Sequence, residues 1–418
     1  MTDAPEASEP ITPVVAEAAK AAHRTNPWRL RDFRLLWVGR IAAVLAIQIQ
    51  SSALLWQVYE IARRDHPIAE ASLYLGLVGL AQFISLLVLT LPAGEMADRR
   101  DRKLTVALSI TVEGLCAIAF LAMALHGSPP LWGLLAVAYL FGACRAFLAP
   151  ASQAFLPMVV GRAALPRAIA AQSIAFQTGA IAGPALGGVI VGLSVPLAYA
   201  VALGFFLTGL SAFLLIRTKG KSERVEGAGG RWDAVKEGLK YVWSTKIVLG
   251  AISLDLLVVL FAGAALLTPI FARDILHVGA QGFGLLRASF GAGAFAMALY
   301  LARFPIMRHG GKRMFASVAV FGCCTLAFGL SKVVWISVNI RQTLIQLSTP
   351  DHMRGRVSPV SMLFIGASNE LGKAYSGLVL RCLGPIGTAA SAASAASAPW
   401  RRRESGPGCF RTCARPTS

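Results

Sequence analysis

The stretch GEMADRRDRK, residues 94–103, ends one apolar run at 72–95 and precedes another at 104–125. Each run is about 20 residues long, enough for a helix to cross ~30 Å of hydrocarbon. The arginines and the lysine of the stretch fill the short connection between the runs, where cations stay at one membrane face. Its Gly lets two helices approach closely, and its Asp can interact with the N-terminus of a neighbouring helix. The stretch therefore predicts two membrane-spanning helices joined by a basic loop.

The rest of the chain repeats this pattern. Of 418 residues, 56% are hydrophobic and only 15% are charged, with a mean hydropathy of +0.61. Soluble proteins usually carry about 25% charged residues. The composition therefore predicts an all-α integral membrane protein. The expected apolar helices lie at 34–58, 72–95, 104–125, 131–157, 167–192, 196–216, 247–272, 282–305, 314–331 and 358–381.

The formal net charge of +19 lies mostly in short loops between apolar runs, which argues against nucleic-acid binding. Loops rich in Lys and Arg face the cytoplasm. One set of loops holds Arg29, Arg31, Arg34, Arg99, Arg100, Arg102, Lys103, Arg162, Arg167, Arg308, Lys312 and Arg313. The opposite set holds little beyond Arg63, Arg64 and Arg273. We therefore expect a cytoplasmic N-terminus, in a bacterial-type inner membrane.

Changes in composition divide the chain into five segments. We expect a disordered cytoplasmic tail, a six-helix half, a basic cytoplasmic linker with a surface helix, a second half and a low-complexity basic tail. Their bounds are 1–28, 29–216, 217–245, 246–388 and 389–418.

Two motifs resemble those of the major facilitator superfamily. The first is the loop motif, carried by Gly94, Asp98, Arg99, Arg102 and Lys103, although Asp101 stands where the family usually has Gly. The second is the antiporter motif of the fifth helix, which is associated with exporters. Its residues are Gly179, Gly183, Pro184, Gly187 and Gly188. The resemblance implies two pseudo-symmetric helical halves.

Two further stretches resemble the siderophore-exporter and multidrug-efflux branch, to which enterobactin exporters belong. They are RAFLAPASQAFLP at 145–157 and IRQTLIQLSTPDHMRGRVS at 340–358. This resemblance implies efflux of a catechol-like or hydrophobic small molecule.

Ionisable residues inside spans are costly and usually face a cavity or a partner. At ~1.5 Å per residue, Glu113, Arg145 and Asp255 lie roughly 14–18 Å from the inner face, near the depth where such transporters bind substrate. Arg145 matches the family's fourth-helix arginine. Glu113 either joins the proton pathway or pairs with Arg145 to lock two helices. Asp255 either carries the proton or makes a structural hydrogen bond.

Gln48 and Gln177 lie at similar or slightly outer depth. They are further pathway candidates, although intramembrane Gln also joins helices by hydrogen bonds.

The second half is shorter than the first. From Lys103 to Arg145 is 42 positions, whereas from Arg313 to its apparent counterpart Arg341 is 28. We therefore expect about 10–11 spans instead of 12. A deleted or frameshifted gene would produce this pattern and the Ala/Ser-rich tail, and a genuine divergent tail is the alternative.

The sequence contains no nucleotide loop or nucleophile motif, so we expect a transporter driven by an ion gradient and not an enzyme. Cys409 and Cys413 have no His partners, and we expect no metal and no cofactor. The expected partners are a small-molecule substrate, protons and the lipid bilayer, with the protein a monomer. An uptake symporter or facilitator, and a truncated non-transporting protein, remain as alternatives.

Overall fold

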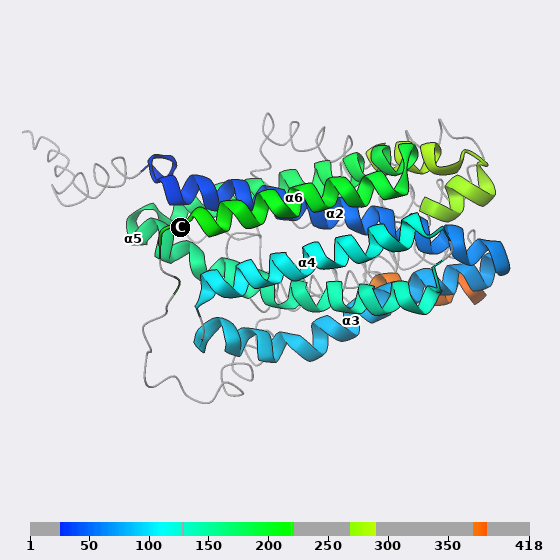
Figure 1. Ribbon diagram of the computed structural model, residues 1–418, viewed down its shortest axis with the longest axis horizontal. Helices are drawn as coiled ribbons and strands as arrows, with labels where there is room; N and C mark the ends of the chain where they lie inside the picture. Colours follow the sequence, from blue (N-terminus) through cyan, green and yellow to red (C-terminus); the bar gives the residue numbers. More distant parts are fainter. Residues whose placement is uncertain are drawn as a thin grey trace, which may run out of the picture.

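The computed structural model describes residues 26–99, 101–127, 129–218, 220, 268–289 and 371–382, and the described residues form helices and connections without a strand. After a short 3-10 helix, η1 (Pro27–Arg29), come the long helices drawn in Figure 1. Their bounds are α2 (Arg31–Asp65), α3 (Ile68–Arg99), α4 (Arg102–Leu125), α5 (Leu131–Leu193) and α6 (Val195–Leu215).

These five helices supply six segments long and apolar enough to cross a membrane, because α5 contains two of them. They are separated near Gly161, whose φ of 70° and ψ of 170° interrupt the helical backbone. A residue with a Cβ rarely adopts a positive φ, so glycine suits this break. The six spans expected in the first half are confirmed.

The helices extend further than the apolar runs indicated. α2 begins at Arg31 and continues through Arg63 and Arg64, which we had expected in a loop. Hydropathy detects only the part of a helix that meets hydrocarbon, whereas backbone hydrogen bonding continues into the polar headgroup region.

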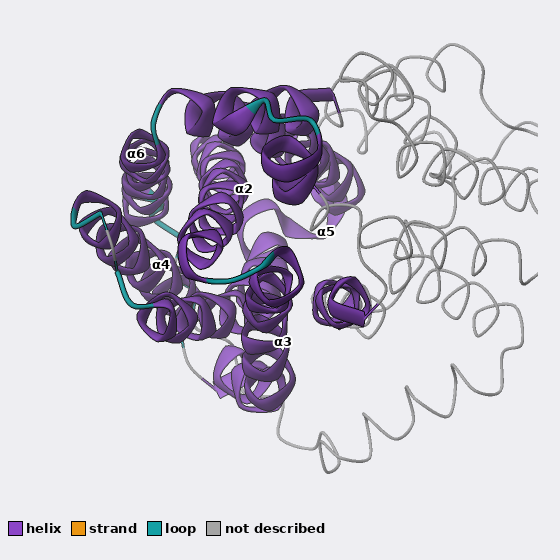
Figure 2. Ribbon diagram, turned by 90° about the vertical axis from the view of Figure 1, so that its right-hand side faces the viewer, coloured by secondary structure: helices purple, strands orange, loops and turns teal. Residues whose placement is uncertain are grey.

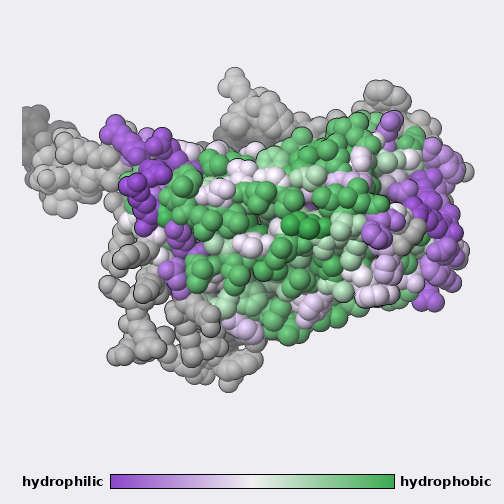
Figure 3. Space-filling view, in the orientation of Figure 1, coloured by the Kyte–Doolittle hydropathy of each residue, from purple (hydrophilic) through white to green (hydrophobic). Residues whose placement is uncertain are grey.

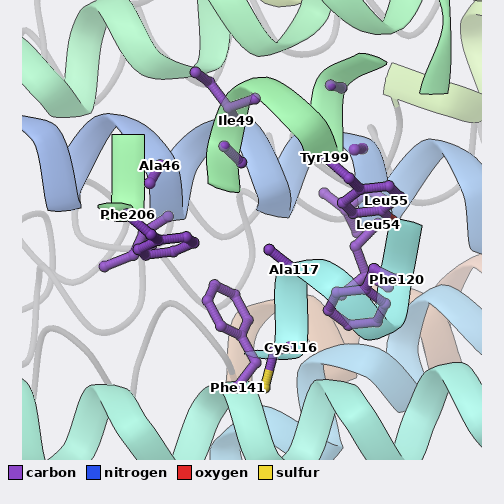
Figure 4. Packing of buried hydrophobic residues seen from close by; sticks show 14 of the residues in the cluster. Ala46, Ile49, Leu54, Leu55, Cys116, Ala117, Phe120, Phe141, Tyr199 and Phe206 are labelled. Carbon is purple, nitrogen blue, oxygen red and sulfur yellow. The ribbon is translucent and has the colours of Figure 1, made fainter. Parts of the chain in front are cut away.

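α2 occupies the centre of the first half, with α5 and α6 as its main neighbours (Figure 2). Buried aromatic rings fill the space between α4, α5 and α6 (Figure 4). Phe120 and Tyr199 stack with their ring centroids 5.4 Å apart. The Tyr199 hydroxyl donates a hydrogen bond to Gln57 Oε1 on α2 at 2.7 Å, so the polar end of this ring is satisfied inside the bundle.

On the face seen in Figure 3, a broad apolar band covers the middle of the described helices and is bounded by hydrophilic residues at both ends. Large apolar side chains remain exposed on several helices, among them Leu108 on α4 and Leu207 on α6. An exposed apolar surface of this extent is unsuited to water and suited to lipid.

Three short pieces of the second half are described. They are the helical segment 268–275, whose last five residues form a π-helix, η2 (Phe271–Ile275), and the helical segments 279–289 and 371–382. Segment 371–382 packs against α3 through two glycines. A Cβ placed on Gly377 would lie only 2.4 Å from the Cα of Gly76. The expected linker helix, Asp255, the shortened region around Arg341 and the C-terminal tail lie outside the described residues.

Candidate functional site

The glycines of the fifth span form the surface by which α5 contacts α2. A Cβ placed on Gly179 would lie 2.5 Å from Val44 Cγ1, and one on Gly183 would lie 2.5 Å from Gln48 Cβ. A Cβ on Gly187 would meet the Cα of Ile49 at 2.9 Å. These distances leave no room for a side chain, so the two helices are as close as glycine permits.

Gly188 extends this contact to the second half of the chain. A Cβ at Gly188 would lie 2.6 Å from Arg287 Cβ and 2.9 Å from the carbonyl oxygen of Gly284. Pro184, inside the same helix, has no N–H to donate to the helical ladder. The antiporter motif thus lies where the two halves meet.

The basic loop between α3 and α4 lies near the start of α2, at the end of the bundle opposite to Asp65. Its residues cap α4 and contact α5 and the end of α6. Asp101 caps α4 by accepting hydrogen bonds from the backbone N–H groups of Lys103 (2.9 Å) and Leu104 (3.3 Å). This is the position where the sequence departs from the family motif, and the capping bond gives a local reason for an aspartate there.

The two cations that follow Asp101 bind backbone carbonyls of other helices. Arg102 Nη1 donates to Ala154 O on α5 at 3.0 Å, and Lys103 Nζ donates to Leu214 O and Ile216 O at 3.1 and 2.5 Å. Gly94, Asp98 and Arg99 lie within α3, and their side-chain surroundings lie outside the description.

Glu113 lies inside the first half, on α4. It is 0% exposed, and neither of its carboxylate oxygens has a hydrogen-bond partner. Two cations interact with it electrostatically, Arg145 on the first span of α5 and Arg40 on α2. A buried carboxylate without hydrogen bonds is costly, and these cations offset part of that cost.

Arg40 was missed in the sequence analysis. Its Nη1 donates to Ser152 Oγ on α5 at 3.2 Å, and its guanidinium carbon lies 5.8 Å from the ring centroid of Phe176. The signal that could have identified it is its distance from Arg31. Nine residues of helix correspond to roughly 14 Å, which places Arg40 well inside the membrane.

The glutamines differ in their surroundings. Gln48 is partly buried against Gly183, and Gln177 is partly buried on α5. Gln50 is 0% exposed, and both atoms of its amide lack a hydrogen-bond partner. Asp255, the other expected proton site, lies outside the described residues.

A polar cluster joins the two halves at the end of α2 far from the basic loop. In this far-end cluster, Tyr59 and Arg63 on α2 both bind the carboxylate of Asp274 on η2. Next to it, Arg273 Nη1 donates to the backbone oxygen of Glu60 at 2.9 Å. From the sequence, Arg63 and Arg273 are predicted only as loop cations. Arg63 and Asp274 lie far apart in the chain, so no local sequence pattern indicates that they pair.

Another contact between the halves lies nearer the middle of α2. Arg287 is 8% exposed and its Nη2 donates to Ser52 Oγ at 2.7 Å, while its Nε has no partner. Trp56 and Phe283 pack beside it with ring centroids 5.0 Å apart. Together with the far-end cluster, these contacts hold the two halves together at one end of the molecule.

No group of His, Cys, Asp or Glu suited to a metal ion occurs among the residues that the structure describes. The buried polar groups described above pair charges and join helices. Such an arrangement can bind and release a proton or an anion as helices move.

Comparison with protein families gives a match over most of the chain. The family model described as transmembrane secretion effector, a major facilitator family, matches residues 22–379. The enterobactin exporter EntS of Citrobacter koseri is 27% identical over 378 residues, covering 85% of this chain and 86% of that protein. EntS of Salmonella typhimurium is 27% identical over 380 residues, with 85% and 86% covered.

Solved structures show the same fold at low sequence identity. A bacterial homologue of the human lysosomal transporter Spinster, inward-facing and unoccupied, has a TM-score of 0.63 at 13% identity, covering 89% of this chain and 93% of that one. A variant of the nucleoside transporter NupG has a TM-score of 0.61 at 13% identity, with 89% and 99% covered. The architecture is therefore the all-α major facilitator fold, as the two motifs implied.

Proposed function

We propose that this chain, which belongs to the transmembrane secretion effector family of major facilitator transporters, exports small organic molecules across a bacterial inner membrane. The likeness to enterobactin exporters over 85% of the chain carries this proposal. The fold alone does not carry it, because one fold serves many substrates. Proteins of similar fold include a nucleoside transporter and a xylose–proton symporter.

The charges inside the bundle favour an anionic substrate. Arg40 and Arg145 place two guanidinium groups within the spans of the first half, near Glu113, and Arg287 adds a buried third in segment 279–289. An excess of cations inside the bundle favours binding of a ligand that brings negative charge. A catecholate of the enterobactin type meets this requirement and carries aromatic rings as well.

Proton exchange is the proposed driving reaction, with the two halves opening alternately to each side. Glu113 and Asp255 are the candidate proton carriers, and Arg145 is the counter-charge that releases the proton. The glycine contacts of α5 with α2 and with segment 279–289 support movement at this interface, because glycine surfaces let helices slide with little steric obstruction. The protein acts as a monomer in this proposal, with its N-terminus in the cytoplasm.

Transport into inside-out vesicles tests the proposal. Purified full-length protein is reconstituted, sorted to inverted orientation, and given enterobactin outside with a pH dye inside. Export by antiport predicts uptake of enterobactin and loss of protons from the lumen. Movement of both in one direction would establish a symporter, and no movement of either, in protein that elutes as a single folded species, would contradict transport of this substrate.

A further inference from the structure

We infer that Arg40 is a positioning residue for proton exchange at Glu113, holding the carboxylate's charge from α2 while Arg145 holds it from α5. This inference rests on the proposed function. It assigns a role to a residue that no motif includes, and it makes the charge on Glu113 a contact shared by three helices.

The first observation is the state of the Glu113 side chain. It is fully buried, and both carboxylate oxygens are without a hydrogen-bond partner. A carboxylate that only locks two helices together would be tied by direct hydrogen bonds to its cation. Here a proton can be added to either oxygen without breaking a hydrogen bond.

The second observation is that Arg40 is held in place by groups other than Glu113. Its hydrogen bond goes to Ser152 on α5, and its guanidinium lies over the ring of Phe176. Ser152 is seven residues from Arg145, which is two helical turns and therefore the same face of α5. Arg40 is thus bound to α5 two helical turns from Arg145, and both arginines interact with Glu113.

The titratable groups that interact with Glu113 come from α2, α4 and α5. Among the described residues, the titratable groups that interact with it are Arg40, Arg145, Cys116 and Cys144. From α6, Leu203 and Phe206 contact the neighbouring Gly114 and add no charge. Among the residues that the structure describes, Arg40 and Arg145 are therefore the cations that interact with the charge of Glu113.

The consequence is a charge balance that changes with one proton. With Glu113 ionised, one carboxylate balances two guanidinium groups. A proton taken from water by a Glu113 oxygen cancels the negative charge, and the two cations then lose their common counter-charge. α2 and α5 lose attraction to α4 at that moment, and release of the proton to water on the other side restores it.

The inference is tested on the carboxyl group itself. In the purified full-length protein, the infrared band of the protonated Glu113 carboxyl is identified by its loss in Glu113→Gln and titrated with pH. Arg40→Gln should move the midpoint of this titration to higher pH by about one unit, because removal of a neighbouring cation favours the neutral carboxyl. Arg40→Lys should restore the midpoint. The matched control is Arg34→Gln, an exposed arginine on the same helix, which should leave it unchanged.

The same variants are then measured for substrate-driven proton release in proteoliposomes. Arg40→Gln should shift the pH profile of release in the same direction as the band, and should have no further effect on a Glu113→Gln background. A uniform loss of rate at every pH with an unmoved band would overturn the inference. If the wild type releases no protons while the band still shifts, the charge contact stands and proton antiport fails.

Protein yield provides a second readout if Arg40→Gln does not fold. Removing both charges leaves no unpaired carboxylate, so Arg40→Gln with Glu113→Gln should recover folded protein. Failure of this double variant, with Glu113→Gln alone folded, would show that Arg40 acts through contacts other than Glu113 and would overturn the inference.

Discussion

Arg63 and Asp274, 211 positions apart in the chain, form an ion pair with Arg63 Nη2 2.7 Å from Asp274 Oδ1. Arg63 Nε donates to the same oxygen at 3.0 Å, and the hydroxyl of Tyr59 donates to the other oxygen, Oδ2. Asp274 lies in the π-helix η2, and π-helical turns often occur at functional positions. The pair therefore joins α2 to the second half at one end of the bundle.

Removal of this pair should shift the protein toward a form open at that end. Arg63→Ala takes away two hydrogen bonds to a carboxylate that is only 9% exposed, so the joined form loses stability relative to the open one. In a Ser52→Cys background, labelling by a membrane-impermeant thiol reagent should become about tenfold faster, a change of ~1.4 kcal/mol.

The neighbouring arginine provides the control. Arg64 Nη1 donates to Gly127 O within the first half, so Arg64→Ala should leave the labelling rate near that of the parent. Equal rates in Arg63→Ala and Arg64→Ala would show that the far-end cluster does not hold the halves together.

Substitution of Gly183 by Leu should block transport while leaving membrane insertion intact. Even a Cβ at this position would lie 2.5 Å from Gln48 Cβ, so a leucine must push α5 away from α2. Export of enterobactin from cells and the elution profile of the purified protein are the measurements. Gly204→Leu on α6 is the matched control, since nothing lies within 4 Å of a Cβ there. Normal export by Gly183→Leu would refute the close-packing interpretation.

Two carboxylates compete for the role of proton carrier. Asp255→Asn should uncouple export from the proton gradient if Asp255 carries the proton, because an amide cannot bind and release one in this range. The measurement is proton release on addition of substrate to proteoliposomes. Unchanged release in Asp255→Asn, together with lost release in Glu113→Gln, would assign the role to Glu113.

The N-terminus and the linker at 217–245 should both be cytoplasmic. The start of the linker lies beside the start of α2, because Thr218 N and Thr218 Oγ1 donate to Asp32 Oδ2 at 2.9 and 2.6 Å. Tags placed at each site should be cleaved by protease in inside-out vesicles and protected in right-side-out ones. Protection of the linker tag in inside-out vesicles would reverse the orientation.

Much of the first half could be predicted from sequence. Its six spans follow from apolar runs, and Glu113 and Arg145 were found because an ionisable residue inside such a run is exceptional. Arg40 was missed because it lies close to the basic residues at the start of α2 and resembles one of them. The roles of Asp255 and of the glutamines stay predictions.

The sequence by itself determined the number, place and type of the helices in this half. In hydrocarbon each span must satisfy its own backbone hydrogen bonds, so helix formation depends on the composition of a single segment. The tertiary structure alone decided that Arg40 approaches Glu113 and that Arg63 binds Asp274. Those contacts depend on the rotation and separation of helices distant in the chain, which side-chain packing between helices sets and no single segment encodes.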